Sequence, residues 1–324
     1  MIKCKSSLLL GSLLALAVHS APVHAQQARS FVSNSFGNDG NAPNCVRSAP
    51  CRTFQVAHDN TLANGEITVL DPGSYGSVTI NRTISIINDG VGEAGMLISG
   101  GVAGVTINAA VTDKVSLRGL TIKGIGFGGG NGIVVNRVGS LTVENCAIRN
   151  LSGSATIGFG ILFLPQLTGA QTSHLAVSNT FVADNDASGI VVEPFGAGKT
   201  YTEIVRSEVY HNGADGITFD DEHFTGVVSG VVESSVSARN ANNGVLAFAP
   251  AQQGPALVLV TRSVVSGNGT GFNSGTSGVI DVAQSDVWSN NVTWTGQVES
   301  YLDNYVHENL DGDPAAPLGS VLKK

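Results

Sequence analysis

A run of titratable side chains in the second half of the chain is the first place where chemistry could occur. Asp220, Asp221, Glu222 and His223 are consecutive, and Glu193 precedes Asp220 by one unit of a repeat that runs through the chain. Carboxylates held about 5 Å apart either raise the pKa of one member or attract a cation. The sequence therefore supports three hypotheses for Glu193, Asp220, Asp221 and Glu222. They form a calcium site built from oxygen ligands, an acid–base pair that acts on a glycosidic bond, or a solvated acidic turn.

Three basic side chains are candidate partners for proton transfer. Lys199 and Arg206 follow Glu193 in the chain, and His223 ends the acidic run. A general base must lie within hydrogen-bond reach of the proton that it removes. If the protein is an enzyme, we expect Asp220, Asp221 and Glu193 to be its reacting carboxylates and one of these basic residues to exchange the proton.

Two sequence marks recur at a nearly fixed spacing and must determine where these side chains lie. The first is a glycine followed by an apolar residue, at Gly132-Ile133, Gly160-Ile161, Gly189-Ile190, Gly216-Ile217, Gly244-Val245 and Gly271-Phe272. The second is a short β-rich segment that ends in asparagine, at Asn150, Asn185, Asn212, Asn240, Asn268, Asn290 and Asn309. A fixed period in this range, about 28 residues, indicates a repeat architecture.

The repeat unit has no helical pattern and no leucine-rich frame. From Val78 onward the chain consists of short Val, Ile, Leu and Thr runs separated by Gly, Asn and Asp. We therefore expect an all-β solenoid, a parallel β-helix in which each strand pairs with its equivalent about 4.8 Å away in the next coil. Between Val78 and Asn309 there is room for about eight such coils.

The segments outside the repeat are assigned by composition. Residues 1–25 combine a basic start, an apolar run and a small-residue end, which predicts a signal peptide and a secreted or periplasmic protein. Residues 26–75 are expected to form a lead-in and cap with a helix at about 53–62, residues 76–310 the β-helix, and residues 311–324 a C-terminal tail. No apolar run is long enough to span a membrane.

Export and charge restrict the covalent links and the partners. Cys45 and Cys51 are close in a loop-like segment, and an oxidising compartment permits a disulfide between them. The formal net charge is −8. Nucleic-acid binding needs clustered Lys and Arg, so we expect no nucleic-acid partner.

The repeated V-x-x-N…G-I units and the opening CRTFQVAHDNTLANGEITVLDPGSYGSVTINRTISI at 51–86 resemble the right-handed parallel β-helix proteins of the pectin-lyase-like superfamily. The resemblance covers about residues 53–310, and it is strongest to secreted bacterial β-helix repeat proteins. It implies a right-handed β-helix behind a short capping helix, with a turn at Pro72-Gly73-Ser74-Tyr75. Some lyases of this superfamily hold calcium on an outer sheet beside a basic residue. The catalytic motifs of its polygalacturonases, pectin methylesterases and pectate lyases are absent here, and the fold alone does not define an activity.

Strand alternation predicts which side chains leave the coil. In the strand that begins at Ile217, Ile217 and Phe219 should point inward, and Thr218 and Asp220 outward. The same register in each coil gives two outward columns: Asn136, Leu164, Glu193, Asp220 and Phe248, and Val134, Leu162, Val191, Thr218 and Leu246. Their apolar members would form an exposed patch typical of an interface, unless neighbouring insertions fold over them.

The repeated asparagines are expected to be structural. Asparagine tolerates the left-handed turn conformation, and its amide can hydrogen-bond to the equivalent residue in the next coil. A sugar-binding groove would instead require exposed aromatic side chains, for which the candidates are Trp288, Trp294, Tyr201 and Tyr210.

These observations lead to one main hypothesis and one alternative. The main hypothesis is an exported β-helix protein that binds, and as an enzyme cleaves, a polysaccharide or cell-envelope glycan through its outer acidic site, with calcium as a candidate cofactor. The alternative is a non-catalytic adhesion protein or structural rod that acts through its surface or as an oligomer.

Overall fold

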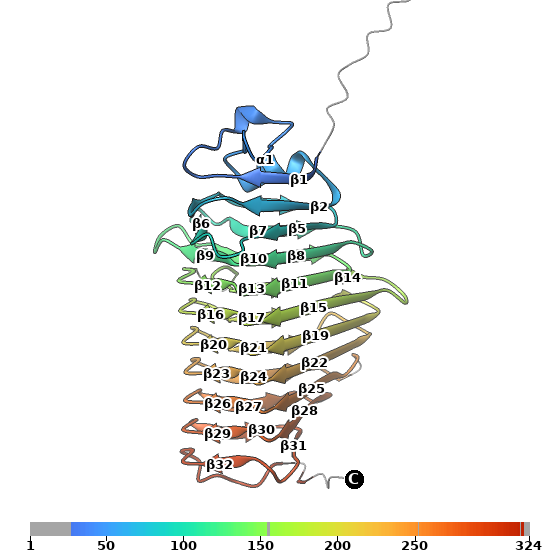
Figure 1. Ribbon diagram of the computed structural model, residues 1–324. Coiled ribbons are helices and arrows are strands. Elements are labelled where there is room, and N and C mark those ends of the chain that lie inside the picture. Colours follow the sequence, from blue (N-terminus) through green and yellow to red (C-terminus); the bar gives the residue numbers. More distant parts are fainter. Residues whose placement is uncertain (1–26, 154–155, 252, 318, 321–324) are drawn as a thin grey trace, which may run out of the picture.

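The chain forms a solenoid whose coils lie one above another along a single axis (Figure 1). The computed structural model describes residues 27–153, 156–251, 253–317 and 319–320. The predicted signal peptide lies outside the described residues, and so does the end of the predicted tail. Within the described residues no helix is both long and apolar enough to cross a membrane.

Three long parallel sheets form the walls of the solenoid, and each coil passes through them in turn (Figure 1). In the described residues the eleven-stranded sheet contains β1 (Gln27–Val32), β2 (Thr61–Val69), β5 (Ile84–Ile87), β8 (Lys114–Arg118), β11 (Ser140–Glu144), β15 (Thr172–Ser178), β19 (Lys199–Val205), β22 (Val227–Glu233), β25 (Ala256–Thr261), β28 (Gly278–Ala283) and β31 (Val298–Ser300). The ten-stranded sheet contains β3 (Gly73–Ser74), β6 (Ala94–Ile98), β9 (Leu120–Gly124), β12 (Ala147–Arg149), β16 (Phe181–Ala183), β20 (Glu208–Tyr210), β23 (Val236–Ala238), β26 (Val264–Ser266), β29 (Asp286–Trp288) and β32 (Tyr305–His307).

The third long sheet, with nine strands in the described residues, contains β4 (Val78–Ile80), β7 (Ala103–Asn108), β10 (Asn131–Arg137), β13 (Ile161–Phe163), β17 (Ile190–Val192), β21 (Ile217–Asp220), β24 (Asn243–Phe248), β27 (Thr270–Ser274) and β30 (Val292–Thr295). A short fourth sheet pairs β14 (Gln166–Leu167) with β18 (Phe195–Gly196). The predicted parallel β-helix is therefore confirmed.

The described part of the chain contains slightly more coils than the sequence period predicts. Nine coils contribute a strand to the nine-stranded sheet, whereas we expected about eight. The last coils are shorter than the middle ones, in which Asn212 pairs with Asn240 across 28 residues. Asn268 pairs with Asn290 across 22 residues, and Asn290 pairs with Asn309 across 19.

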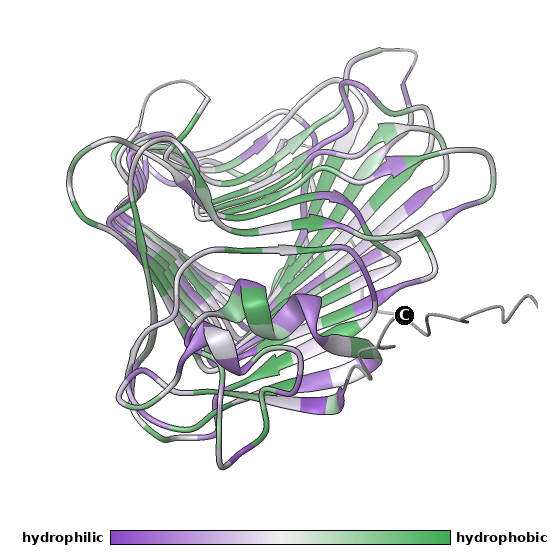
Figure 2. Cartoon of the chain, turned by 90° about the horizontal axis from the view of Figure 1, so that it is seen from above, coloured by the Kyte–Doolittle hydropathy of each residue, from purple (hydrophilic) through white to green (hydrophobic). Residues whose placement is uncertain are grey.

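The core is a set of apolar columns inside the coils (Figure 2). Ile133, Ile161, Ile190 and Ile217 stack in register on the nine-stranded sheet and are fully buried. The glycine before each of them lies where neighbouring coils approach closely. A Cβ at Gly160, for example, would lie 2.4 Å from the carbonyl oxygen of Gly189, so the repeated Gly-Ile pair combines a close backbone contact with a core position.

The N-terminal helix, α1 (Phe54–Asp59), lies at the first end of the solenoid (Figures 1 and 2). It is shorter than the predicted 53–62 because Thr53 is its N-cap and Thr61 already begins β2. Phe54 is buried, with its ring centroid 5.0 Å from that of Tyr75. A short 3-10 helix, η1 (Asp39–Asn41), precedes it, and a disulfide joins Cys45 to Cys51 in the same lead-in.

A ladder of buried asparagine amides joins the coils where the chain leaves the ten-stranded sheet. Asn185 Nδ2 donates to Asn212 Oδ1 at 3.0 Å, and the pattern continues through Asn240, Asn268, Asn290 and Asn309. The left-handed residue of each turn is mostly the one before the asparagine, such as Asp184 or His211, rather than the asparagine as expected. Asn150 is exposed and lies outside this ladder.

A second ladder, which the sequence did not lead us to expect, lies where the chain passes from the eleven-stranded to the ten-stranded sheet. The hydroxyl of Ser207 accepts from the backbone N–H of Thr180, and Ser235, Ser263 and Ser285 continue the series. In each coil of these ladders one side-chain oxygen, from a serine or an asparagine, accepts a backbone N–H from the tight turn of the preceding coil. Both corners are therefore held in the same register along the solenoid.

Candidate functional site

Glu193 and Asp220 lie in the outward column that strand alternation predicts. Val192 pairs with Phe219, and each carboxylate follows directly in its own coil. Asp220 in turn pairs with Phe248. Phe219 is fully buried while Asp220 is partly exposed, as the alternation expected for β21 predicts, whereas Thr218, also expected to point outward, is only 6% exposed. The two carboxylates are therefore neighbours on the outer face of the nine-stranded sheet.

His223 completes what we call the outer acidic cluster, namely Glu193, Asp220, Glu222 and His223. His223 Nδ1 lies 3.2 Å from Glu193 Oε1, and the His223 ring stacks on Phe195 with centroids 4.9 Å apart. The backbone N–H of Glu222 donates to Asp220 Oδ1 at 2.8 Å. The stacking and the hydrogen bonds hold the turn after β21 against the turn that precedes it by one coil.

Glu193 and Asp220 hold their protons more tightly than ordinary carboxyls do. Burial, and then the charge of Asp220, raise the pKa of Glu193 against the opposing effect of His223. Burial also raises the pKa of Asp220, against its bond from the Glu222 N–H. Asp221 and Asp281 also have a raised pKa. Three of the four are adjacent, and clustered perturbed groups are typical of functional sites.

Asp221 faces the interior, away from the outer acidic cluster. Its residue is 0% exposed, and neither carboxyl oxygen has a hydrogen-bond partner. The buried Phe224 donates its backbone N–H to the Asp221 carbonyl, and Gly254 lies beside Oδ2. Burial and the nearby Asp220 raise the pKa of Asp221 to about 7. The sequence grouped Asp221 with its neighbours, but strand alternation turns it to the opposite side.

The predicted basic partners Lys199 and Arg206 lie on other parts of the solenoid. Lys199 begins β19 and is exposed on the eleven-stranded sheet. Arg206 occupies the left-handed corner after β19, where its Nε donates to Asn179 Oδ1 at 3.0 Å. Of the three basic candidates, the fold brings only His223 to the carboxylates.

The residues expected to bind calcium do not converge. Calcium needs several oxygen ligands around one point. Asp221 faces the core, Asp220 accepts a backbone N–H, and Glu193 contacts His223. Within the described ranges no three His, Cys, Asp or Glu side chains are arranged to hold a metal ion. Glu193, Asp220, Asp221 and Glu222 therefore do not fit a calcium site in this arrangement.

The apolar outward column is partly covered and does not form the exposed patch that we considered. Val134, Leu162, Val191, Thr218 and Leu246 are in register as expected. Val191 and Thr218 are only 6% exposed, and no member belongs to the exposed large apolar side chains. This surface therefore gives no support to a subunit interface.

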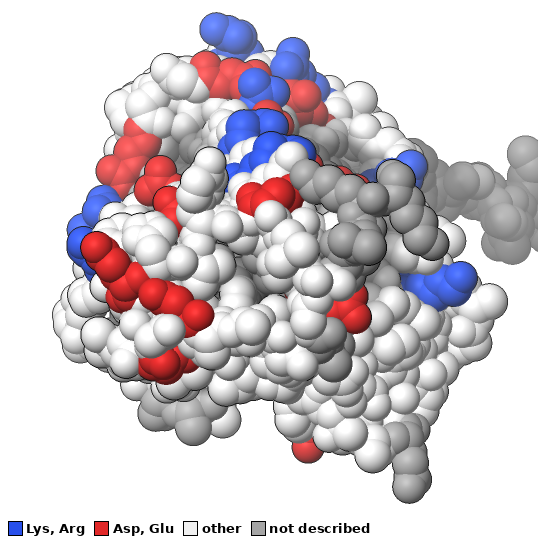
Figure 3. Space-filling view, turned by 90° about the horizontal axis from the view of Figure 1, so that it is seen from below, with Lys and Arg blue, Asp and Glu red and all other residues white. Residues whose placement is uncertain are grey.

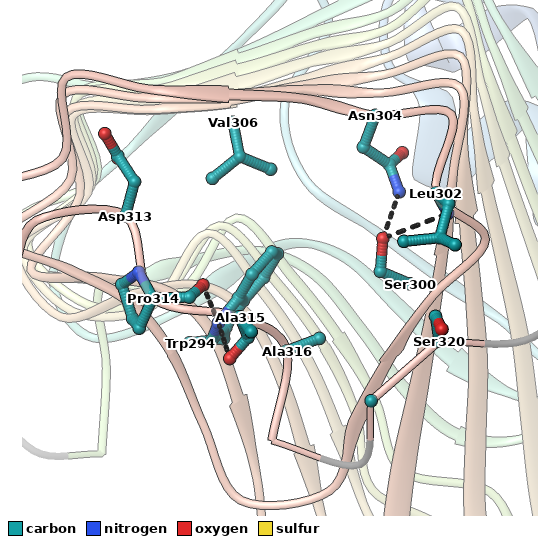
Figure 4. A pocket seen from close by; sticks show the side chains of 11 residues that line it. Trp294, Ser300, Leu302, Asn304, Val306, Asp313, Pro314, Ala315, Ala316 and Ser320 are labelled. Carbon is teal, nitrogen blue, oxygen red and sulfur yellow. Dashed lines mark hydrogen bonds between the residues drawn. The ribbon is translucent and has the colours of Figure 1, made fainter.

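Trp294, a candidate sugar contact, is instead a packing residue at the C-terminal end (Figure 4). It is 6% exposed, and its Nε1 donates to the carbonyl oxygens of Pro314 and Ala315 at 3.1 and 3.2 Å. The segment that it holds crosses the last coil and borders a depression of about 380 Å³ lined mainly by apolar atoms. Viewed from this end, acidic side chains form separate patches on a largely uncharged surface (Figure 3). Trp288 and Tyr201 are exposed, as sugar contacts must be.

Comparisons with known proteins place the fold. The chain is similar to the solved structure of pectate lyase Pel9A, at 16% identity and a TM-score of 0.49, covering 84% of this chain and 67% of that one. It is also similar to the A-module of the mannuronan C-5 epimerase AlgE6 from Azotobacter vinelandii, at 13% identity and a TM-score of 0.39, covering 80% and 89%. A sequence comparison with curated proteins found no match. The family model described as "Right handed beta helix region" matches residues 103–287, more than half of the chain, and the protein therefore belongs to the right-handed β-helix family.

Proposed function

We propose that this protein is exported and binds a polysaccharide at the outer acidic cluster, where Glu193 transfers a proton to the bound glycan. The observation that carries the proposal is the pair formed by Glu193 and Asp220. These carboxyls lie on neighbouring strands, both have a raised pKa, and one of them contacts an imidazole.

The surroundings of the cluster suit a sugar. Leu164 and Phe248 occupy the same outward column on either side of the carboxylates, and the Phe195–His223 stack lies beside them. Carboxyls accept and donate hydrogen bonds to sugar hydroxyls, while apolar and aromatic groups contact the C–H faces of the rings. This combination supports a glycan rather than a small metal ion as the ligand.

The proposed chemistry follows from the raised pKa of Glu193 and from its contact with His223. A carboxyl with a raised pKa can protonate the oxygen of a glycosidic bond as that bond breaks. Asp220, about 5 Å away on the neighbouring coil, suits the role of a nucleophile that forms a covalent bond to the anomeric carbon. Water then displaces Asp220 and gives its proton to Glu193, which restores both carboxyls, while His223 holds Glu193 in position.

The test is a glycan panel with site variants. The protein is incubated with neutral and uronate-containing polysaccharides, with and without calcium. New reducing ends report hydrolysis, and ultraviolet absorbance of unsaturated uronates reports elimination. We expect new reducing ends with at least one glycan, and a loss of about 100-fold or more in Glu193→Gln. Glu203→Gln, an exposed carboxylate on the eleven-stranded sheet, is the matched control.

Binding is measured separately by affinity electrophoresis in gels that contain each glycan. Retardation of the wild type that is lost in Asp220→Asn, without turnover in any assay, would restrict the proposal to binding. Absence of both retardation and turnover across the panel would contradict the proposed function.

The alternative function, a structural rod, is favoured by one observation. In the last described coil and the segment after it, Leu302, Tyr305 and Leu310 are exposed. Exposed apolar side chains next to unpaired strand edges favour association. Sedimentation velocity over a range of concentrations distinguishes this function, because a rod that assembles through this end should lose its self-association in Tyr305→Lys.

A further inference from the structure

A second surface, remote from the outer acidic cluster, follows one column of the ten-stranded sheet. Lys123, Arg149, Tyr210 and Trp288 occupy equivalent positions in different coils of this sheet, because each strand pairs in register with the next. Strand spacing of about 4.8 Å places Lys123 and Trp288 roughly 29 Å apart along the solenoid. We call this line of side chains the outer track; the fully buried Ala183 separates Arg149 from Tyr210 within it.

Two cations stand next to each other at the N-terminal part of the track. Lys123 and Arg149 are directly paired positions on β9 and β12. In the described part of the chain neither forms an ion pair, although like charges about 5 Å apart repel each other. On a protein with a net charge of −8, such an unpaired cation pair is a local site for an anion.

Lys123 also borders two open depressions, of about 680 and 500 Å³. Asp184 and Asp186 line the first, but Asp184 contacts His211 at 2.6 Å and Asp186 accepts the backbone N–H of Gly153 at 2.9 Å. Glu93 lines the second. Lys123 is therefore the cation of the first depression, and the two carboxylates there are held by His211 and Gly153 rather than by Lys123.

Aromatic pairs occupy two further points of the track. Tyr210 and Phe181 meet edge to face at 5.1 Å between centroids. Trp288 lies parallel to His307, with 3° between the planes, and His307 Nε2 lies 3.1 Å from Asp286 Oδ1. Trp288 is 38% exposed. Asp286 thus fixes the imidazole that supports the indole, and the indole keeps an open face.

The surface between the two aromatic pairs is built from small side chains. Three strand steps, roughly 14 Å, separate Tyr210 from Trp288, and the positions between them are Ala238, which is partly exposed, and Ser266, which is only 8% exposed. Val236 and Val264 lie beside them in the neighbouring outward column. An extended chain could lie on this low surface with a ring against each aromatic pair.

We propose that the outer track binds an extended anionic polysaccharide. Its carboxylate or sulfate groups pair with Lys123 and Arg149, and its rings stack on Tyr210 and Trp288. A pyranose unit in an extended chain repeats at a distance close to the strand spacing of about 5 Å, so successive sugars follow successive coils. The exposed Glu208 in the neighbouring column restricts the anionic contacts to the part near Lys123 and Arg149.

This proposal does not depend on the proposed function, because the two surfaces lie on different sheets and share no residue. The experiment is affinity electrophoresis of the full chain in gels that contain polygalacturonate, dextran sulfate or neutral dextran. We expect retardation by at least one anionic polymer, decreasing as salt rises. The polymer that retards the protein more strongly identifies carboxylate or sulfate as the preferred group.

Two variants test the two halves of the track. Lys123→Gln/Arg149→Gln should weaken binding to the anionic polymer about tenfold or more, because charge-assisted contacts are lost. Trp288→Ala should weaken it several-fold. The matched controls are Lys114→Gln, an exposed cation on the eleven-stranded sheet, and Phe36→Ala, an exposed aromatic in the lead-in, which should both bind like the wild type.

The Lys123→Gln/Arg149→Gln variant separates this proposal from the proposed function, since it should lose binding to the anionic polymers and keep any release of reducing ends at the outer acidic cluster. The proposal would be overturned by wild-type affinity in Lys123→Gln/Arg149→Gln or by an equal loss of affinity in Lys114→Gln. It would also be overturned if neither anionic polymer retarded the protein.

Discussion

The phenyl ring of Phe219 occupies the space that a side chain at position 230 would need. A Cβ on Gly230 would lie 2.2 Å from Cε1 and 2.4 Å from Cζ of that ring. Phe219 belongs to the nine-stranded sheet and Gly230 to the eleven-stranded sheet, so this contact sets how closely two walls of the solenoid approach in that coil. Phe219 is fully buried, and protein interiors are packed closely enough that a buried ring has little room to move.

Gly230→Ala should therefore destabilise the protein by about 1–3 kcal/mol through overpacking. Urea denaturation followed by circular dichroism measures the change. The double variant Phe219→Leu/Gly230→Ala should recover part of the loss, because the smaller side chain makes room for the new methyl group. Ser229→Ala, at the outward-facing neighbour, is the control, and a double variant that is as unstable as the sum of its single changes would contradict this contact.

The buried carboxyl of Asp221 should make stability depend on pH. Its pKa rises from 3.8 to about 7 on folding, so between these values the unfolded chain releases a proton that the folded protein keeps. The free energy of unfolding should then fall as pH rises from about 4 to 7, by at most about 4 kcal/mol, and change no further above that range on account of this group.

Urea midpoints at pH 5 and pH 8 test this expectation. Asp221→Asn should remove most of the decrease between the two values, because the amide does not titrate. Glu203→Gln should leave the pH dependence of the wild type in place. An Asp221→Asn protein with the same decrease as the wild type would show that Asp221 is not its source.

Loss of one rung from the asparagine ladder should be costly. In Asn240→Ala the backbone N–H and Nδ2 of Asn212 lose their acceptor, and Oδ1 of Asn268 loses a donor. Each buried unpaired group costs about 1–3 kcal/mol, so we expect a total of about 3 kcal/mol or more in urea denaturation. Asn242→Ala, an exposed asparagine in the same turn, should change stability by less than about 0.5 kcal/mol.

The Cys146 thiol should be unreactive in the folded protein. Burial raises its pKa to about 11, so little reactive thiolate exists near neutral pH. Alkylation with iodoacetamide at pH 8, followed by peptide mass spectrometry, should leave Cys146 unlabelled in the native state and labelled in denaturant. Rapid native labelling would mean that this coil opens readily.

The fold follows from local signals that repeat, and for that reason the sequence is enough to predict it. Each Gly-Ile pair marks a close backbone contact and a core position, and one asparagine in each of several coils marks a ladder. The serine ladder was not predicted, because serine is common at protein surfaces and a single serine does not indicate a buried hydrogen bond. The spacing of 28 residues between Ser207, Ser235 and Ser263 nevertheless repeats the main period.

The candidate site was only partly predictable, since it depends on strand alternation and on corners. The register correctly brought Glu193 beside Asp220. The same alternation, applied one residue further, would have turned Asp221 inward. Lys199 and Arg206 are close to Glu193 in sequence, but the chain turns a corner between them and the carboxylates. Residues on the two sides of a corner lie on different sheets, so their side chains do not meet.

Asp313 gives the asparagine ladder a chemical end. Its Oδ1 accepts both the backbone N–H and Nδ2 of Asn309, and these bonds lower the pKa of Asp313, so the acceptor stays ionised in mild acid. Each asparagine of the ladder accepts a hydrogen bond at its side-chain oxygen and donates another from Nδ2 to the next residue of the ladder. A carboxylate accepts and has nothing to donate. Asp313 therefore closes this end of the ladder, because its carboxylate accepts both bonds from Asn309 and passes none on.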